Sequence, residues 1–172
     1  MDKTVLVLGG ARSGKSRWAE KSIENTKASV SYIATAQAFD DEMQARISEH
    51  RKQRSDTWET IEAPLELPKT VKHVSKDRII LVDCLTLWLS NLMLAEHDID
   101  RATQELLVAL AARQAPTVLV SNEVGMGLVP ETPLGRAFRD AQGRLNQAVA
   151  AEAQTVVFVA AGLPLVLKGT LE

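Results

Sequence analysis

The sequence predicts an α/β protein in which helices cover both faces of a mostly parallel sheet. Two observations indicate this class. Short, continuous apolar runs of strand length recur along the chain, and segments with the apolar spacing of helices separate them. Strands that alternate with helices are joined by crossover connections, which make neighbouring strands parallel. Because the runs are continuous rather than alternating, we expect strands that are buried on both faces.

Five apolar runs are the expected strands, at residues 3–9, 29–35, 78–84, 116–122 and 155–161. Six segments have the spacing of helices, at residues 15–26, 40–54, 65–75, 85–95, 98–113 and 133–153. The last helix is expected to begin with Thr132 as its N-cap and Pro133 as its first residue. The residues expected on its buried stripe are Leu134, Phe138, Leu145 and Val149. Trp88 is expected in the core or in an interface.

Length, charge and cysteine content narrow the functional class. The chain of 172 residues has the size of one domain, 1–172. Its formal net charge of −2 provides no general attraction to nucleic acid or to an anionic membrane. The lone cysteine, Cys84, excludes an internal disulfide and is typical of a reducing compartment. No apolar run approaches the ~18 residues of a membrane span, so we expect no such span. From the charge and the lone cysteine we expect a cytoplasmic protein without a nucleic-acid partner.

A glycine-rich loop follows the first expected strand. Its sequence matches the phosphate-binding pattern G-x-x-x-x-G-K-[ST] at every fixed position, with a strand before it and a helix after it. The loop consists of Gly9, Gly10, Ala11, Arg12, Ser13, Gly14, Lys15 and Ser16. Its amide groups and the helix N-terminus are suited to bind phosphates, Lys15 to reach the β- and γ-phosphates, and Ser16 to bind Mg²⁺. The sequence therefore predicts a P-loop NTPase-like nucleotide site; the alternative is a glycine-rich turn with an incidental lysine.

Asp83 is the second expected ligand of Mg²⁺. It ends the strand 78–84, and ligands of parallel α/β sheets bind at the carboxyl ends of the strands. Together with Ser16 it would bind the metal directly or through water. Its alternative role is that of an N-cap for the helix that begins near Leu85. Asn122 and Glu123 lie at the end of the expected strand 116–122, and they either shape a substrate pocket or belong to a structural loop or a subunit contact.

A phosphate loop alone does not decide whether the nucleotide is hydrolysed, donates a phosphoryl group or is itself transferred. A signalling GTPase would normally carry the guanine-reading tetrapeptide Asn-Lys-x-Asp, which does not occur in this sequence. The chain is also short for a motor or transporter ATPase. These observations favour a transferase.

The segment 40–54 contains a candidate nucleophile, His50. Met43 and Ile47 are spaced by four residues and His50 follows by three, so that the histidine borders the apolar stripe of an expected helix. Arginines four residues before and after it would hold the imidazole neutral near pH 7 and neutralise phosphate oxygens. A neutral histidine beside a triphosphate is a plausible covalent nucleophile. From spacing alone, however, a half-buried helix residue on a solvated face is the favoured interpretation.

The sequence resembles the bifunctional adenosylcobinamide kinase / adenosylcobinamide-phosphate guanylyltransferase family of cobalamin biosynthesis. The resemblance extends from Gly9 to about Lys168. It rests on "GGARSGKS" (9–16), "YIATA" (32–36), "DDEMQARISEHRKQR" (40–54), W-x-T-x-E-x-P (58–64), "VDCLTLWLSNL" (82–92), "SNEVGMGLVPETPLGRAFRDAQGRLNQ" (121–147) and "AGLPLVLK" (161–168). The block 121–147 and the "RISEH" motif are the most specific of these.

The resemblance implies two reactions. In the first, a nucleoside triphosphate phosphorylates the aminopropanol hydroxyl of adenosylcobinamide. In the second, GTP guanylylates a histidine, and the GMP passes to adenosylcobinamide phosphate to give adenosylcobinamide-GDP and pyrophosphate. The family's nucleophile falls on His50, which reverses the interpretation from spacing alone.

The resemblance also implies ATP and GTP as substrates, Mg²⁺ as cofactor and a homotrimeric assembly. Thr35, Arg51 and Glu62 are the further residues expected to contact the nucleotide, beside the phosphate loop and Asp83. Two alternatives stay open at this point. One is a small-molecule kinase without guanylyl transfer, in which His50 is incidental, and the other is a nucleotide-dependent switch or assembly subunit that turns over no corrinoid.

Overall fold

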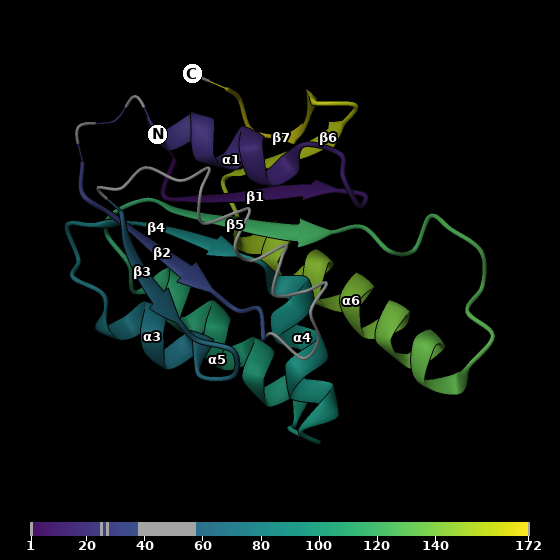
Figure 1. Cartoon of the computed structure of the whole chain (residues 1–172). Coiled ribbons are helices and arrows are strands. Elements are labelled where there is room, and N and C mark those ends of the chain that lie inside the picture. The colour runs from purple at the N-terminus through teal and green to yellow at the C-terminus, as the bar shows by residue number, and fades with distance from the viewer. Residues whose placement is uncertain (1, 25, 27, 38–57, 172) are drawn as a thin grey trace.

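The chain forms a seven-stranded sheet with helices on both of its faces in the computed structural model, which describes residues 2–24, 26, 28–37 and 58–171 (Figure 1). The strands are β1 (Thr4–Gly9), β2 (Val30–Ala34), β3 (Glu59–Glu62), β4 (Ile79–Asp83), β5 (Thr117–Asn122), β6 (Thr155–Ala160) and β7 (Leu163–Lys168). The helices are α1 (Lys15–Glu24), α3 (Leu67–His73), α4 (Leu85–Leu94), α5 (Ile99–Ala111) and α6 (Pro133–Glu152). The described helices include none long and apolar enough to cross a membrane.

The strand order is β3-β2-β4-β5-β1-β6-β7. Every neighbouring pair is parallel except β6 and β7, which are antiparallel. The expected α/β fold with a mostly parallel sheet is therefore confirmed. Because the strands are parallel, the carboxyl ends of β1, β5 and β4 meet at one edge of the sheet, and β5 separates the other two.

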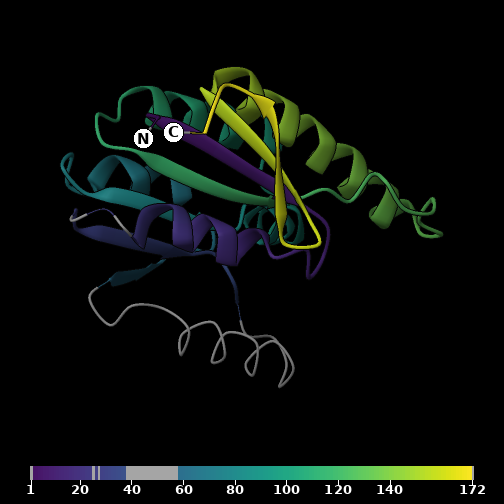
Figure 2. The ribbon, with the colours of Figure 1, turned by 90° about the horizontal axis from the view of Figure 1, so that it is seen from above.

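Alternate residues of the central strands enter two different apolar clusters, which explains why their sequences are apolar without alternation. On β1, Val5 and Val7 pack with Ala19 and Ile23 of α1. The residues between them pack on the opposite face, in a cluster that includes residues of α3, α4, α5 and α6. Figure 2 shows α1 and α6 on opposite sides of the sheet.

Two strands were not expected from the sequence. The strand β3 is short, lies at the edge of the sheet and is exposed over most of its length, so it has no apolar run. The strand β7 is also an edge strand, and all its residues are exposed. It follows β6 through the two-residue turn Ala161–Gly162, in which both φ angles are positive (52° and 78°). Positive φ at both positions is the signature of a type I′ hairpin.

The expectations for α6 are confirmed in part. The Thr132 side chain accepts a hydrogen bond from the Gly135 amide at 3.1 Å, as an N-cap should. On the expected buried stripe, Leu145 and Val149 are buried. The inclusion of Leu134 in that stripe was wrong, because 58% of it is exposed. The loop before α6 and the start of the helix extend away from the sheet (Figure 1).

The expected core position of Trp88 is confirmed. The side chain is 1% exposed, and its indole N–H donates to the carbonyl oxygen of Leu65 at 2.9 Å. The expected helix 40–54 lies outside the described residues.

Candidate nucleotide site

The phosphate loop joins β1 to α1 at the carboxyl edge of the sheet. Within it, the Ser13 amide donates to the carbonyl oxygen of Gly10 at 3.3 Å. Arg12 and Gly14 have positive φ angles, of 56° and 92°. The left-handed conformation is accessible to glycine without a steric penalty, which explains the glycine at position 14. The loop is therefore folded into a tight turn directly before the first residue of α1.

The β6–β7 turn supports this loop from outside. The Gly162 amide donates to the carbonyl oxygen of Ser13 at 2.8 Å. A methyl group on Gly14 would lie 3.1 Å from the α-carbon of Gly162. A methyl group on Gly9 would lie 2.5 Å from Ser13 Oγ and 2.6 Å from the carbonyl oxygen of Val159. Gly9 and Gly14 are thus required by packing against neighbouring segments as well as by the space that a phosphate needs.

Lys15 holds its ammonium group at the loop. The residue is buried, and its Nζ donates to the carbonyl oxygen of Gly10 at 3.1 Å. An ammonium group has three protons to donate. In this position it can neutralise oxygens of a phosphate that occupies the loop.

Asp83 ends β4 and presents a carboxylate to the same face of the sheet as α1. The alternation along β4 establishes the face, because Leu81 packs with α1 while Val82 packs on the other side. One carboxylate oxygen, Oδ2, accepts from the hydroxyl of Tyr32 on β2 at 3.0 Å. The alternative role as an N-cap does not apply, since the N-cap of α4 is Cys84. The carboxylate is therefore available to the site.

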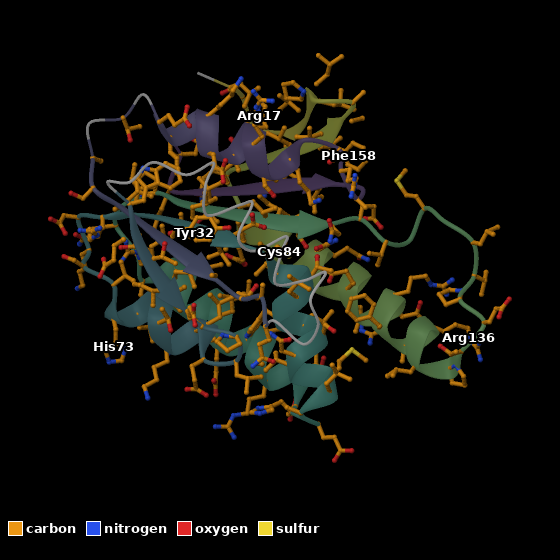
Figure 3. All side chains as sticks on the ribbon, in the orientation of Figure 1. Arg17, Tyr32, His73, Cys84, Arg136 and Phe158 are labelled. Atoms are coloured by element: carbon orange, nitrogen blue, oxygen red, sulfur yellow. The ribbon has the colours of Figure 1, made fainter. Side chains whose placement is uncertain are left out.

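The charges of Asp83 and Lys15 lie close enough together to act on one thiol. Burial, together with the charge of Asp83, raises the pKa of Cys84 to about 11, and the charge of Lys15 opposes this rise. Tyr32 and Cys84 are labelled in Figure 3, beside the carboxyl ends of the central strands. A cation and a carboxylate thus border the space between β1 and β4.

The residues expected to bind Mg²⁺ fit that ion by their chemistry. Ser16 is half-buried in the first turn of α1, and its hydroxyl forms no hydrogen bond within the described part of the chain. A hydroxyl and a carboxylate are hard oxygen donors of the kind that Mg²⁺ prefers. Among the described residues no group of three or more His, Cys, Asp or Glu could hold a metal. Two protein ligands are nevertheless sufficient for Mg²⁺, which completes its shell with water and phosphate oxygens.

Thr35 lies just beyond β2 and is completely buried. Its hydroxyl donates to the carbonyl oxygen of Cys84 at 2.7 Å and accepts from the Cys84 amide at 2.9 Å. Its own carbonyl oxygen accepts from the side chain of Asn91 at 2.8 Å. In this structure Thr35 therefore connects β2 to the start of α4, and its hydroxyl proton is already donated to Cys84. Its predicted role as a nucleotide contact stays a prediction.

Glu62 lies at the carboxyl end of β3, exposed to solvent. Four strand spacings separate β3 from β1, which corresponds to about 19 Å across the sheet. Glu62 therefore lies away from the phosphate loop but at the same edge of the sheet. His50 and Arg51 belong to the chain segment between β2 and β3 and lie outside the described residues.

A buried polar cluster at this edge was not predicted from the sequence as a unit. It consists of Thr86 on α4, Ser121 and Asn122 on β5, and Gln142 and Asn146 on α6. The available signal was the helical spacing of Gln142 and Asn146 within an apolar stripe, opposite a strand that ends in Ser-Asn. The amide of the next residue, Glu123, donates to the carbonyl oxygen of Gly9 at 3.1 Å, which ties this cluster to the phosphate loop.

The arrangement brings loop amides, an ammonium group, a hydroxyl and a carboxylate to one edge of the sheet. Such a set binds a nucleoside triphosphate and stabilises the charge that moves when a phosphoryl or nucleotidyl group is transferred. The two described histidines do not take part in it. His73 lies on α3 at the periphery, where Nδ1 contacts the carbonyl oxygen of Lys69 at 2.7 Å (Figure 3), and His97 is exposed.

Solved structures with similar folds include P-loop ATPases. One is described as a prototypical ATPase from the type III secretion system of pathogenic bacteria; it has a TM-score of 0.60 and 11% identity, over 95% of this chain and 56% of that chain. Another is the assembled ATPase EscN of enteropathogenic Escherichia coli, with a TM-score of 0.57 and 9% identity, over 93% of this chain and 43% of that chain. At such identities the likeness establishes the fold alone.

Sequence comparison identifies the family. The bifunctional adenosylcobalamin biosynthesis protein CobP of Pseudomonas aeruginosa is 48% identical over 167 residues, which cover 95% of this chain and 96% of that protein. The bifunctional adenosylcobalamin biosynthesis protein CobU of Escherichia coli K12 is 41% identical over 180 aligned positions, which cover 95% and 99%. The family model described as cobinamide kinase / cobinamide phosphate guanyltransferase matches residues 5–167. A phosphate loop with an intact lysine, a carboxylate across β5 and this nearly full-length match establish that the chain belongs to the cobinamide kinase / cobinamide phosphate guanyltransferase family.

Proposed function

We propose that this protein phosphorylates adenosylcobinamide with a nucleoside triphosphate and then transfers GMP from GTP to the product, through a histidyl-GMP intermediate on His50. The observation that carries the proposal is the intact phosphate loop in a chain that matches the family over residues 5–167. Both reactions need a triphosphate whose leaving phosphates are held and neutralised, and the loop has the groups for this task.

In the kinase reaction, the hydroxyl oxygen of the corrinoid side chain forms a bond to the γ-phosphorus. The bond from the γ-phosphorus to the β,γ-bridging oxygen breaks, the nucleoside diphosphate leaves, and the hydroxyl proton is released to solvent. Lys15 and the loop amides hold the β- and γ-phosphates in place during this step. Ser16 and Asp83 would hold Mg²⁺, which when bound supplies charge neutralisation at the phosphate oxygens.

In the guanylyl transfer, an imidazole nitrogen of His50 forms a bond to the α-phosphorus of GTP, and pyrophosphate leaves. An oxygen of adenosylcobinamide phosphate then attacks the same phosphorus, the P–N bond breaks, and the imidazole is regenerated. Imidazole is suited to both roles, because it is a nucleophile when neutral and a good leaving group when protonated. Lys15 would stabilise the departing pyrophosphate.

Thr35, Arg51 and Glu62 are proposed to contact the nucleotide in the second reaction. The distance of about 19 Å between β1 and β3 supports this assignment. It provides room for a GTP whose leaving phosphates lie at the phosphate loop while its nucleoside lies towards Glu62. ATP and GTP are proposed as the substrates.

Labelling with radioactive GTP tests the covalent step. The pure protein is incubated with GTP labelled at the α-phosphate, denatured, and analysed for label that stays on the chain. We expect acid-labile, base-stable label in the wild type and none in His50→Asn. Binding of GTP without any retained label would leave only the kinase reaction. Transfer of label from γ-labelled ATP to adenosylcobinamide tests that reaction separately, and its absence would contradict the kinase assignment.

A cytoplasmic homotrimer is the proposed state of the protein. Support for assembly comes from exposed apolar side chains at two places, the loop before α6 and the edge strand β7. Examples are Met126, Leu128 and Leu163, which are 79%, 96% and 71% exposed. Large exposed apolar side chains that gather in one segment commonly mark a contact with another protein. Light scattering coupled to gel filtration measures the mass, and a monomer across the concentration range would contradict this part of the proposal.

A further inference from the structure

The side chain of Asn122 lies at the nucleotide site but has no role in the reactions described above. It ends β5, and its partner in the parallel ladder is Gly9, the first residue of the phosphate loop. Val118 and Val120 on the same strand pack in the cluster that contains α1. Because side chains alternate along a strand, Asn122 lies on this same face. Asp83 of the neighbouring strand β4 also lies there, so that Asn122 stands between the phosphate loop and this carboxylate.

The backbone of Asn122 is held from two sides. Its amide donates to Oγ1 of Thr86 at 2.8 Å, and its carbonyl oxygen accepts from Nδ2 of Asn146 at 3.0 Å. Asn146 is itself held, since its Oδ1 accepts from the Ser121 hydroxyl at 2.6 Å and from Nε2 of Gln142 at 2.9 Å. Buried polar networks of this kind rigidify the residue that they surround. The position of Asn122 is therefore set before any ligand binds.

The carboxamide of Asn122, in contrast, has no hydrogen-bond partner among the described residues. Its Oδ1 is buried without a hydrogen bond to any residue that the structure describes, and its amide nitrogen makes none either. A buried polar atom without a partner is unfavourable, and in native proteins it often marks a functional site. The two ends of a carboxamide exchange when the group is turned over, so it can offer either a donor or an acceptor at this position.

A second buried oxygen without a hydrogen-bond partner among the described residues lies beside Gly9. It is Ser13 Oγ, which would contact a methyl group on Gly9 at 2.5 Å. Ser13 and Asn122 come from distant parts of the chain, and both leave hydrogen-bonding capacity unused beside the same glycine. This coincidence points to a polar ligand that meets both groups at the mouth of the phosphate loop.

We propose that Asn122 contacts the γ-phosphate of the bound nucleoside triphosphate, with its amide group donating to a γ-phosphate oxygen. The inference rests on the nucleotide site proposed above. In a phosphate loop the backbone amides surround the α- and β-phosphates, and the lysine reaches the β- and γ-phosphates. A group that stands between this loop and Asp83 is therefore placed at the γ end of the chain of phosphates. Asn122 thereby distinguishes a triphosphate from a diphosphate.

Binding measurements with GTP and GDP test the proposal directly. All proteins carry His50→Asn, so that no covalent transfer disturbs the equilibrium. Calorimetry gives the ratio of the two dissociation constants, Kd(GDP)/Kd(GTP). For Asn122→Ala we expect this ratio to fall about tenfold, while the Kd for GDP changes less than about twofold, because one hydrogen bond to a charged oxygen is lost. Asn122→Asp keeps the size of the side chain but adds a negative charge, and its ratio should fall further.

Thr117→Val is the matched control. Thr117 lies at the opposite end of the same strand, and its Oγ1 is also buried without a partner in the described structure. We expect the ratio to be unchanged in this variant. A ratio that stays the same in both Asn122 variants, or equal losses for GTP and GDP, would overturn the proposal. Thermal melting without nucleotide shows whether each variant is folded. If an Asn122 variant is not folded, Thr86→Val is measured in its place, because it removes only the acceptor for the backbone amide of Asn122.

The variant Lys15→Ala distinguishes a failure of the Asn122 proposal from a failure of the proposed nucleotide site. Lys15→Ala should weaken the binding of both nucleotides, because the lysine contacts the β-phosphate that GDP retains. If Lys15→Ala has no effect, the site is wrongly assigned and the Asn122 proposal falls with it. If Lys15→Ala is impaired but the Asn122 variants keep the wild-type ratio, the site stands and only the role of Asn122 is refuted.

Discussion

Gly14 combines two constraints in one residue. Its φ of 92° lies in the region that glycine adopts freely, and its α-carbon faces Gly162 of the β6–β7 turn. The first constraint concerns the backbone of the loop, and the second concerns a segment that is distant in the sequence. A side chain at this position would therefore strain the loop and displace the turn that supports it.

We predict that Gly14→Ala lowers the free energy of unfolding by about 1–3 kcal/mol and weakens nucleotide binding. The matched control is Gly127→Ala, since a methyl group on Gly127 has no atom within 4 Å. Chemical denaturation and a nucleotide titration measure the two effects. An equal response of both variants would show that the contact with Gly162 has no energetic importance.

The Cys84 thiol is a second residue-scale feature with a measurable consequence. Burial raises its pKa to about 11, so that the native protein holds almost no thiolate at pH 8. We expect a thiol reagent to modify the native protein at least about a hundredfold more slowly than the guanidinium-unfolded chain. Because the pKa of Cys84 in the folded protein exceeds the ordinary thiol value of 9.0, the stability of the protein decreases as the pH rises from about 9 towards 11. Rapid labelling of native protein at pH 8 would contradict this environment.

The helix α6 shows at the scale of an element how a glycine can be tolerated or required. Gly143 lies inside the helix, and a methyl group there would meet no atom within 4 Å. Gly135 lies in the first turn, where a methyl group would approach Cβ of Pro130 at 2.9 Å and Oγ1 of Thr132 at 3.0 Å. The two positions differ only in their surroundings, because both have a helical backbone.

We predict that Gly143→Ala raises the free energy of unfolding by about 0.5–1 kcal/mol, which is the cost of glycine in a helix interior. Gly135→Ala should not stabilise the protein, because the Thr132 cap must shift. Thermal melting of the two variants side by side is sufficient to distinguish them. Stabilisation by both would mean that the capped turn has more space than the distances indicate.

The edge strands show which elements can be recognised from their own sequence. The four central strands β1, β2, β4 and β5 are covered on both faces, and their apolar runs predicted each of them correctly. The strand β3, with the sequence Glu-Thr-Ile-Glu, becomes a strand only because β2 offers it a free edge. The hairpin turn Ala161–Gly162 carried a usable signal for β7, an alanine–glycine pair between two apolar segments.

At the scale of the whole molecule, the sheet order decides where Asp83 lies relative to the phosphate loop. The strand β5 separates β1 from β4, so the phosphate loop and Asp83 stand on either side of Asn122. Ligands that bridge the loop and Asp83 would connect the two halves of the sheet edge. Binding of such a ligand to the folded state alone raises its stability by mass action.

We predict that GTP with Mg²⁺ raises the melting temperature of the wild-type protein. At a hundredfold excess over Kd, the free energy of unfolding should rise by about 2.7 kcal/mol. Removing the metal with EDTA should reduce this gain. In Asp83→Asn the gain should be smaller and nearly independent of EDTA, since one of the two ligands is neutralised. Differential scanning fluorimetry measures all four conditions, and a metal-dependent shift that survives intact in Asp83→Asn would exclude Asp83 as a ligand.

Local patterns were sufficient for the central strands, the phosphate loop and the cap at Thr132, because each depends on residues that are close neighbours in the chain. The presence of Asp83 at the carboxyl end of a strand was also visible in this way. These features specify the class of fold and the kind of ligand. The roles of His50 and Arg51 stay predictions, since both lie outside the described residues.

Strand order and the partners of single side chains depended on tertiary packing. Nothing near Asn122 in the sequence indicates that it pairs with Gly9, or that Thr86 and Asn146 hold its backbone. Nor does the sequence show that its carboxamide oxygen has no hydrogen-bond partner in the described part of the chain. The turn at Gly162 likewise supports a loop almost the whole chain away. Such contacts join segments whose patterns are locally independent, and only the burial of both faces of the sheet brings them together.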